Sequence, residues 1–415
     1  MSEYLVGIDI GSSKVYAAVA KVDENKENLL ISGISSAKCD GLSKGIVIDL
    51  EETSLSIQKC IGQLEDLIGK SIETVNLVIP QKLYEFYDNK GVVAITSGDR
   101  KIREEDIKRV EAAVRNITVQ PSKEIIGIIY KEFTIDEKTK VKNPIGYVGD
   151  KLELDAQIIV GRVTSLNNLF NSVKKAGILV EGIDVQSEAV AKAVLKKDER
   201  KNGVAIIDVG EQTIDISVYK NDYLWYTKNI PLGGKNITND ISIGLKLAYN
   251  KAEELKINYG TLAYEEDEVI ISSSNYIEND ITLSNLVEII DARIDEFLGF
   301  IKDDLEVNHI LEEIEGAVIV GGGITQFKGI IEKCEEALDK PVRIGVPNYI
   351  GGASTMFANV IGVLVNVFET MPKEEEQGLE EELFNFSKEE KEENEEKEKN
   401  ISLADKIKNF FADLF

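Results

Sequence analysis

Two segments of the same design, far apart in the sequence, constrain the fold of this chain more than any other feature. The first is YLVGIDIGSSKVYAAVA at residues 4–20, and the second is GVAIIDVGEQTIDISVY at residues 203–219. In each, an apolar run ends near an aspartate, Asp9 or Asp208, a glycine follows two residues later, and a second apolar run comes after the turn. This pattern is typical of a β-hairpin. The repetition predicts an α/β protein with two domains of similar fold, one beginning at each hairpin.

The composition of the chain excludes several classes of function. Its 415 residues are enough for two large domains. Its formal net charge of -26 would repel DNA, RNA and anionic lipid, so nucleic acid is not an expected partner and any membrane contact must come mainly from apolar burial. The three cysteines lie far apart, which predicts neither a disulfide framework nor a Cys-based metal site. We expect a cytoplasmic protein, because no signal peptide and no transmembrane helix is predicted.

The segments between and after the hairpins have their own patterns. Residues 83–165 predict a separate α/β subdomain, with an amphipathic helix at residues 100–116 and strands in IIGIIYKEFTIDEK and LELDAQIIVGRV. Residues 240–260 form one long helical pattern that ends at a glycine, and residues 316–338 predict a buried strand, a glycine-rich turn and a helix. A late apolar segment, GGASTMFANVIGVLVNVFE, predicts a helix that closes the first domain.

The two hairpin turns and the glycine-rich turn together predict a site for ATP and Mg²⁺. A triphosphate bound with Mg²⁺ needs backbone N–H groups for the phosphates and carboxylates for the hydrated metal ion. One such turn alone is usually only a turn, but three in this order are more specific. We expect Asp9 and Asp208 to hold the metal through water. The predicted nucleotide-binding residues of the three turns are Gly11, Ser12, Ser13, Lys14, Gly210, Glu211, Gln212, Thr213, Gly321, Gly322 and Gly323.

These motifs resemble those of the actin/hexokinase/heat-shock-70 ATPase superfamily. GIDIGSSKV and IIDVGEQTIDISVY are similar to its two phosphate loops, and VIVGGGITQFKGI is similar to its adenosine motif. Within the superfamily the chain most resembles the FtsA family of bacterial cell-division proteins, because YKEFTIDEKTKVKNPIGYVGDKLELDAQIIVG is similar to the inserted subdomain 1C of that family. The resemblance implies an actin-like two-domain ATPase fold with duplicated RNase H-like domains. It also implies that Glu253 and Lys256, in an Ala-Glu-x-x-Lys segment, face the ribose and adenine.

The resemblance further implies where the subdomains begin and end. The expected boundaries are 1–82, 166–202 and about 346–372 for subdomain 1A, 83–165 for 1C, 203–235 and 311–345 for 2A, 236–310 for 2B, 373–400 for a disordered acidic linker, and 401–415 for an amphipathic helix.

The chain departs from the family pattern in its second phosphate loop. Relatives carry D-x-G-G-G-T or close to it, whereas Glu211 and Gln212 stand here in place of two glycines. A carboxylate beside phosphates repels them, and a side chain limits the approach of the backbone, so we expect at most a slow ATPase. The candidate catalytic residues are Asp208 and Glu188, the latter near the position where relatives place the residue that orients the attacking water. Glu188 can equally be a plain glutamate on a helix surface.

The end of the chain predicts a tethered membrane anchor. Residues 373–400 contain thirteen Glu and five Lys, which is typical of a disordered linker. On a helix, the apolar residues of ISLADKIKNFFADLF fall in one arc of roughly 140°, flanked by lysines that reach toward headgroups. The expected membrane-binding residues are Leu403, Ile407, Phe410, Phe411, Leu414, Phe415, Lys406 and Lys408. Docking of this helix in a partner's groove or on the protein's own core stays open.

The resemblance implies a cell-division function. An FtsA-like protein would bind ATP with Mg²⁺, polymerise with copies of itself, and tether FtsZ filaments to lipids at the cytoplasmic face of the membrane at the division site. FtsZ would contact subdomain 2B, and later divisome proteins are further expected partners. Two alternatives stay open: a sugar or acid kinase of the same superfamily, and a PilM-like scaffold of a pilus or secretion apparatus.

Overall fold

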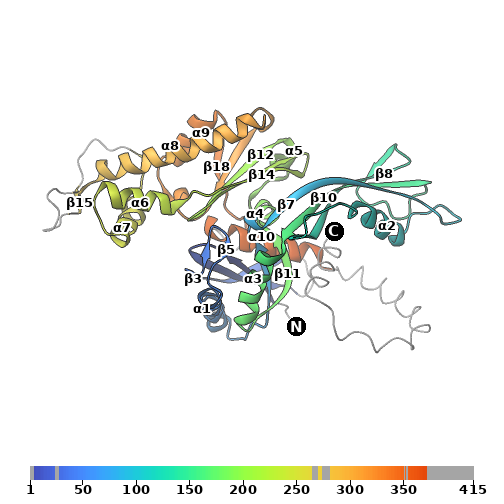
Figure 1. Cartoon of the computed structure of the whole chain (residues 1–415), viewed down its shortest axis with the longest axis horizontal. Helices are drawn as coiled ribbons and strands as arrows, with labels where there is room; N and C mark the ends of the chain where they lie inside the picture. Colours follow the sequence, from blue (N-terminus) through green and yellow to red (C-terminus); the bar gives the residue numbers. More distant parts are fainter. Residues whose placement is uncertain are drawn as a thin grey trace.

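The computed structural model describes residues 4–23, 28–263, 270–272, 281–349, 351 and 354–371. The predicted linker at 373–400 and the predicted helix at 401–415 lie outside the described residues. The described residues form two α/β domains and an inserted subdomain (Figure 1). Within this part of the chain, no helix is both long and apolar enough to cross a membrane.

The first domain is built on a five-stranded sheet that begins with the first predicted hairpin. Its strands, in spatial order, are β11 (Leu179–Val185), β6 (Thr74–Ile79), β1 (Tyr4–Ile10), β2 (Lys14–Val22) and β3 (Leu29–Lys38). β1 pairs antiparallel with β2 and parallel with β6, so the hairpin extends into a mixed sheet. The central strands are almost entirely buried, as expected for a sheet that is covered on both faces.

Helices cover both faces of this sheet. α1 (Leu50–Ile68) and α3 (Val163–Lys175) pack on one face, while α10 (Ala358–Thr370) and α4 (Gln186–Val194) pack on the other. Asp49 caps α1 by accepting a hydrogen bond from the Glu52 backbone, and Gly69 ends the helix in the left-handed region, which favours glycine. α10 is the late apolar helix, and its packing against β1, β6 and α4 confirms that it closes the first domain.

The second domain repeats the strand arrangement of the first. Its sheet runs β14 (Tyr223–Ile230), β13 (Ile214–Lys220), β12 (Val204–Val209), β17 (Gly316–Val320) and β18 (Val342–Ile344). The hairpin strands β12 and β13 pair antiparallel, and β17 pairs parallel with β12, as β6 does with β1. The predicted duplication, and with it an α/β protein of two domains with similar sheets, is therefore confirmed.

The helices of the second domain extend beyond its sheet. They are α6 (Gly234–Gly244), α7 (Tyr249–Tyr259), α8 (Leu283–Val307) and α9 (Ile330–Leu338). α6, α7 and the first part of α8 form one end of the molecule, next to the short strands β15 (Ile270–Ser272) and β16 (Ile281–Thr282) (Figure 1). A single apolar core connects these helices with β12, β13 and β17.

One helix prediction in the second domain is wrong. The pattern at residues 240–260 predicts a single helix, but the structure has two helices separated at residues 245–248. Gly244 ends the first helix, and Lys246 adopts a positive φ of 52° that an α-helix cannot contain. The turn is stabilised because the Ser242 hydroxyl donates to the carbonyl of Leu247 at 2.7 Å. The apolar period continues through the break, which is why the sequence did not show it.

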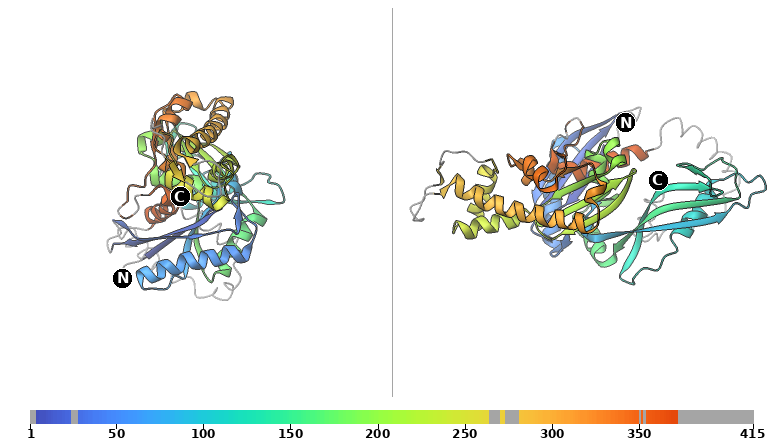
Figure 2. Two further views of the ribbon diagram at one scale, coloured as in Figure 1. Left: turned by 90° about the vertical axis from the view of Figure 1, so that its left-hand side faces the viewer. Right: turned by 90° about the horizontal axis from the view of Figure 1, so that it is seen from above.

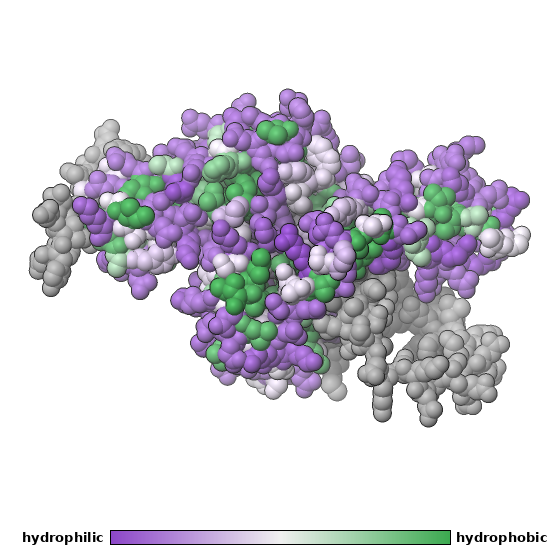
Figure 3. All heavy atoms as spheres, in the orientation of Figure 1, coloured by the Kyte–Doolittle hydropathy of each residue, from purple (hydrophilic) through white to green (hydrophobic). Residues whose placement is uncertain are grey.

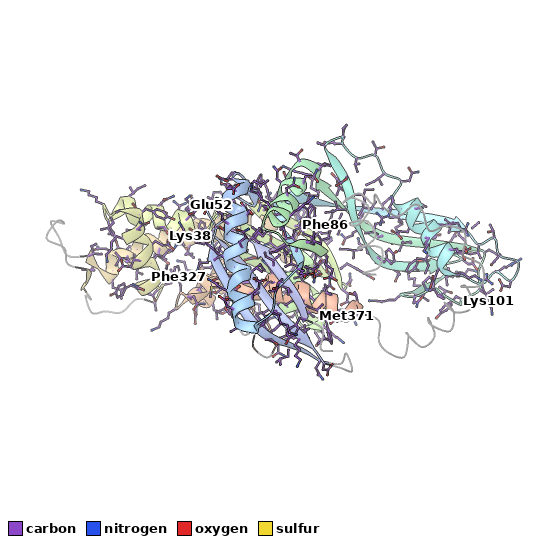
Figure 4. All side chains as sticks on the ribbon, turned by 90° about the horizontal axis from the view of Figure 1, so that it is seen from below. Lys38, Glu52, Phe86, Lys101, Phe327 and Met371 are labelled. Carbon is purple, nitrogen blue, oxygen red and sulfur yellow. The ribbon has the colours of Figure 1, made fainter. Side chains whose placement is uncertain are left out.

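The inserted subdomain is an antiparallel sheet with one helix against it. Its sheet runs β7 (Tyr84–Ala94), β10 (Lys151–Arg162), β8 (Lys123–Ile135) and β9 (Thr139–Val141), and α2 (Glu104–Val114) packs on β7 and β10. The helix and both strands predicted here are confirmed. The subdomain projects from the body at the end opposite to α6 and α7 (Figure 2). Phe86 lies near its base and Lys101 near its far end (Figure 4).

Two kinds of contact join the parts. Buried residues of α4 pack against β12, β13 and β17 of the second domain, and this group includes Tyr219 and Leu224. At the base of the inserted subdomain, the Gln157 amide donates to the carbonyl of Leu224 in β14 at 2.7 Å. On the face drawn in Figure 3, hydrophilic residues predominate and hydrophobic residues form small groups, in keeping with the acidic composition.

Candidate nucleotide-binding site

A cleft of about 1150 Å³ lies between the two domains. Turns from both hairpins and from the glycine-rich segment line it, and Lys38 of the first domain and Phe327 of the second, both labelled in Figure 4, also line it. The structure brings to this cleft all of the predicted nucleotide-binding and metal-binding residues, namely Asp9, Gly11, Ser12, Ser13, Lys14, Asp208, Gly210, Glu211, Gln212, Thr213, Glu253, Lys256, Gly321, Gly322 and Gly323.

The two hairpin turns have the same local structure. In the first turn, residues 11–14, the Gly11 N–H donates to the carbonyl of Lys14 at 3.0 Å. In the second turn, residues 210–213, the Gly210 N–H donates to the carbonyl of Thr213 at 2.9 Å. Each turn follows a strand that ends at the cleft, so both present backbone groups to the same space. Such groups can bind an anion.

Asp9 and Asp208 meet across the cleft through one amide. The Asn359 side chain, from α10, donates to Asp9 Oδ2 at 3.1 Å and to Asp208 Oδ2 at 3.4 Å. Burial raises the pKa of Asp9 to about 6, the Asn359 hydrogen bond opposes the rise, and the charge of Asp208 adds to it. Burial also raises the pKa of Asp208. These carboxylates are held by a neutral amide, so their negative charge is left for a cation.

A third carboxylate, Asp215, belongs to the same cluster and was missed by the sequence analysis. It is 7% exposed, and burial raises its pKa to about 7. It accepts hydrogen bonds from the Asn229 amide at 2.6 Å and the Thr213 hydroxyl at 3.1 Å. Strand alternation places Ile214 on the core side of β13 and Asp215 on the side of the cleft. The alternation of Ile214, Asp215, Ile216 and Ser217 was the signal that could have identified it, because it places Asp215 on the face of β13 opposite to the two isoleucines.

Glu188 does not reach the cleft. Its carboxylate accepts a hydrogen bond from the Tyr219 hydroxyl at 2.8 Å and pairs with Arg200 at 3.4 Å. The residue that α4 does present to the cleft is Gln186, whose amide donates to Asp208 Oδ2 at 3.1 Å. Two residues along a helix correspond to a rotation of about 200°, so a shift of two positions moves a side chain to the opposite face.

The Glu211 side chain faces the second domain's own helices. Its carboxylate lies 3.5 Å from the Tyr249 hydroxyl and 3.2 Å from the point that a Cβ on Gly234 would occupy. Burial raises its pKa, and the charge of Lys256 opposes the rise. Glu211 is therefore turned toward α6 and α7. Gly233 permits this close approach, because a Cβ there would lie 2.5 Å from the carbonyl of Gly210.

Glu253 and Lys256 form a fixed pair on α7. Lys256 is 6% exposed, and its Nζ lies 2.7 Å from the Glu253 carboxylate and 2.7 Å from the Thr238 hydroxyl. The Glu253 carboxylate also accepts a hydrogen bond from Thr238. Lys256 thus packs beneath α6, with Glu253 beside it on the cleft wall.

The glycine-rich turn also lines the cleft. Gly321 has a φ of 108°, and a Cβ there would lie 2.3 Å from the carbonyl of Val209, so only glycine fits. The hydroxyls of Thr325 and Thr355 donate to the carbonyl of Gly321 at 2.7 and 2.8 Å. The turn leads into a single 3-10 turn at Ile324–Gln326, and α9 begins only at Ile330, later than the sequence predicts. Gly323 has no heavy atom within 4 Å of the point that a Cβ would occupy, so the space beside it is open.

The residues present fit a hydrated Mg²⁺ bound with a triphosphate. Asn359 Oδ1 and Asn229 Oδ1 are buried and have no hydrogen-bond partner among the described residues, so the cluster has unused oxygen acceptors as well as three carboxylates. Within the described ranges, no group of three or more His, Cys, Asp or Glu side chains is arranged to hold a metal ion. The predicted contact through the water shell of the ion stays a prediction.

Comparison with known proteins identifies related chains. A family model described as "Cell division protein FtsA" matches residues 205–362, and one described as "SHS2 domain inserted in FTSA" matches residues 82–160. The FtsA of Bacillus subtilis (strain 168) is 32% identical over 369 residues, covering 88% of this chain and 83% of that protein. The FtsA of Borreliella burgdorferi is 34% identical over 354 residues, covering 84% and 86%.

Solved structures show the same fold at low sequence identity. The PilM-PilN type IV pilus biogenesis complex contains a chain that matches with a TM-score of 0.61 and 16% identity, over 89% of this chain and 99% of that one. MreB5 of Spiroplasma citri bound to ADP matches with a TM-score of 0.53 and 14% identity, over 92% and 99%. Identities this low establish the actin-like fold and nothing about partners.

Proposed function

The chain belongs to the FtsA family of cell-division proteins, and on that premise we propose that it binds ATP with Mg²⁺ in the interdomain cleft, polymerises, and tethers FtsZ filaments to the inner face of the cytoplasmic membrane at the division site. One observation carries the nucleotide part. Two hairpin turns of the same structure, one from each domain, face a single cleft beside a cluster of buried carboxylates. MreB5 of Spiroplasma citri, which has the same fold, has solved structures bound to ADP and to AMPPNP.

We assign roles from the positions of the groups. The backbone N–H groups of residues 11–14 and 210–213, together with Lys14, would hold the phosphates. Asp9 and Asp208 would hold the water shell of the metal ion, which supplies charge neutralisation at the phosphates when it is bound. The adenosine would lie between the Gly321–Gly323 turn and the wall that contains Glu253 and Lys256.

Any ATP hydrolysis should be slow. Gln186, and not Glu188, is the α4 residue placed to orient a water molecule, and its amide is already engaged by Asp208 and, at 3.4 Å, by Asp215. An amide can orient water but is not a general base. The main role of the protein is therefore structural, and nucleotide binding would serve to order the two domains for polymerisation.

The membrane part of the proposal rests on the sequence of residues 401–415. Six large apolar side chains in one arc could contribute about 9 to 18 kcal/mol if they were fully buried. Partial insertion and the ordering of the helix remove much of that gain. A single copy on a protein with net charge -26 should bind reversibly, and a polymer should bind strongly because many helices act together.

Pelleting with lipid vesicles tests the tether. The full chain should pellet with vesicles and should carry purified FtsZ with it, more so when ATP and Mg²⁺ are present. A chain that lacks residues 401–415 should bind ATP normally but leave FtsZ in the supernatant. If the truncated chain pellets FtsZ with vesicles as well as the full chain does, the proposed anchor is refuted.

A further inference from the structure

The Gln212 side chain leaves its own domain and crosses the cleft. Its Oε1 accepts hydrogen bonds from the Ser43 hydroxyl at 3.1 Å and from the Lys44 N–H at 3.2 Å, and its Nε2 donates to the Ser12 carbonyl at 3.4 Å. Gln212 belongs to the second turn, whereas its three partners belong to the first domain. One side chain therefore joins the second turn to the first turn and to the hairpin formed by β4 (Leu42–Ser43) and β5 (Ile46–Val47).

The partners of Gln212 are held in fixed positions. The β4–β5 turn has two left-handed residues, Lys44 at a φ of 48° and Gly45 at 77°, as a two-residue hairpin turn requires. The Gly45 N–H donates to the Ser12 hydroxyl at 3.0 Å, which ties this hairpin to the first turn. The first turn and the β4–β5 hairpin thus form one unit, and Gln212 contacts that unit from the opposite side of the cleft.

A second glutamine, Gln81, connects the domains in a different environment. Gln81 is 5% exposed, and its amide donates to the carbonyls of Ile216 at 3.2 Å and Lys228 at 2.8 Å. The contact to Ile216 is buried and the contact to Lys228 is half-buried, whereas the Gln212 contacts are half-buried or exposed. Buried hydrogen bonds cannot be exchanged for water without a large cost, but those near solvent can. When the domains separate, the Gln81 contacts should persist as part of the hinge, and the Gln212 contacts should break.

We propose that Gln212 is a latch: a positioning residue that holds the two turns together across the cleft and so slows the release of a bound nucleotide. This inference rests on the proposed binding of ATP between those turns. The three bonds come from one side chain, so they form and break together with closure. The latch contributes only in the closed form, because in an open cleft water satisfies all three partners.

Release of a fluorescent nucleotide measures the latch in the full chain. Bound mant-ATP with Mg²⁺ is chased with excess ATP, and the dissociation rate is compared between wild type and Gln212→Ala. We expect the rate to rise about tenfold in the variant, equivalent to about 1.4 kcal/mol. The matched control is Gln63→Ala, the same truncation on the exposed face of α1, which should release mant-ATP at the wild-type rate.

A double-mutant cycle separates the latch from an independent effect on the turn. Ser43→Ala removes one of the three partners and should raise the rate by a smaller factor, because Lys44 and Ser12 still contact Gln212. Added to Gln212→Ala, it should raise the rate no further. Additive effects of the two substitutions would overturn the proposal, and so would a wild-type rate in Gln212→Ala.

The domain spacing gives a readout that does not require nucleotide. Spin labels on Lys59→Cys in α1 and Glu306→Cys in α8, both exposed, report the distance between the domains. In nucleotide-free protein, Gln212→Ala should shift the distances toward longer values. If wild type fails to bind mant-ATP, the proposed nucleotide binding is wrong. The spin-label distances then still test whether Gln212 holds the two domains together. An unchanged distance distribution in Gln212→Ala would refute it.

Discussion

Replacement of Asp215 by asparagine should stabilise the nucleotide-free protein at high pH and weaken its binding of Mg²⁺ and ATP. Asp215 is buried on β13, and it accepts hydrogen bonds from Thr213 and Asn229. Asparagine has nearly the same shape and carries no charge. The new amide needs an acceptor, and Asn229 can provide one by rotating its amide, because its Oδ1 has no partner among the described residues.

The size and sign of the stability effect follow from the pKa of Asp215. Burial raises this pKa from 3.8 to about 7, which corresponds to about 4 kcal/mol at 1.36 kcal/mol per pKa unit. The folded-state pKa lies above the unfolded one, so between pH 4 and 7 the folded protein binds more protons. Its free energy of unfolding therefore falls as pH rises through that window. The contacts of the new amide will be less favourable than those of the carboxylate, which reduces the gain. The free energy of unfolding of Asp215→Asn should therefore exceed that of wild type by about 2 kcal/mol at pH 8 and by little at pH 4.

Urea unfolding of nucleotide-free protein at pH 5 and pH 8 measures this effect. The only tryptophan, Trp225, lies on β14 beside β13, is 47% exposed, and reports the unfolding of the second domain. The matched control is Asp184→Asn. Asp184 is buried, and burial likewise raises its pKa to about 7, but it does not line the cleft. Both variants should gain stability at pH 8.

Only the cleft variant should change ligand binding. Removal of one negative charge from the cluster should lower the affinity for Mg²⁺ and ATP about tenfold in Asp215→Asn and leave it unchanged in Asp184→Asn. Isothermal titration calorimetry at pH 8 measures both. The reasoning is refuted if Asp215→Asn has wild-type stability at both pH values. Ionisation of the Asp215 carboxyl would then not lower the free energy of unfolding.

Three further predictions concern the nucleotide and the membrane. Asp208→Ala should lose at least tenfold in affinity for Mg²⁺ and ATP, because one of the two proposed metal-binding carboxylates disappears. If wild type and variant bind equally well, Asp208 does not belong to the site. Glu211→Gln should tighten ATP binding about threefold in an equilibrium titration, because it removes a charge from the second turn, and unchanged binding at low salt would show that Glu211 is already neutralised. Phe411→Glu should abolish pelleting with vesicles, since a charge in the apolar arc costs up to about 3 kcal/mol, whereas Asp413→Asn on the polar face should pellet as wild type does. Continued pelleting of Phe411→Glu would place residues 401–415 in a partner's groove.

The duplicated fold could be predicted because its signals are local. Each hairpin has an alternating or continuous apolar pattern around a turn with a glycine, and a turn of this kind forms from its own residues. The order of the three turns along the chain was enough to place them in one cleft. The inserted subdomain was predicted for the same reason, because β8 and β10 are long strands with strong patterns of their own.

The parts that could not be predicted depend on contacts between distant residues. Asn359 reaches Asp9 from a helix near the other end of the described chain, and no local pattern marks it as a site residue. The choice between Gln186 and Glu188 depends on the phase of α4, which an alignment error of two positions reverses. Gln212 was expected to disturb the phosphate turn, but its side chain crosses to Ser43 and Lys44, partners that only the folded structure brings near.

The way in which the cleft carboxylates are held would make the proposed metal site costly to the nucleotide-free protein and useful to the loaded one. Asp9, Asp208 and Asp215 take hydrogen bonds from the amides of Asn359, Gln186 and Asn229. Amides fix the position of a carboxylate without cancelling its charge. None of the ion pairs formed by the described residues includes these three aspartates, although other carboxylates of the chain pair with lysine or arginine. A lysine here would make the empty cleft more stable and would compete with the metal ion. Neutral partners therefore leave a negative field that would attract a cation, and the raised pKa values of Asp9 and Asp215 reflect the cost of burying that charge.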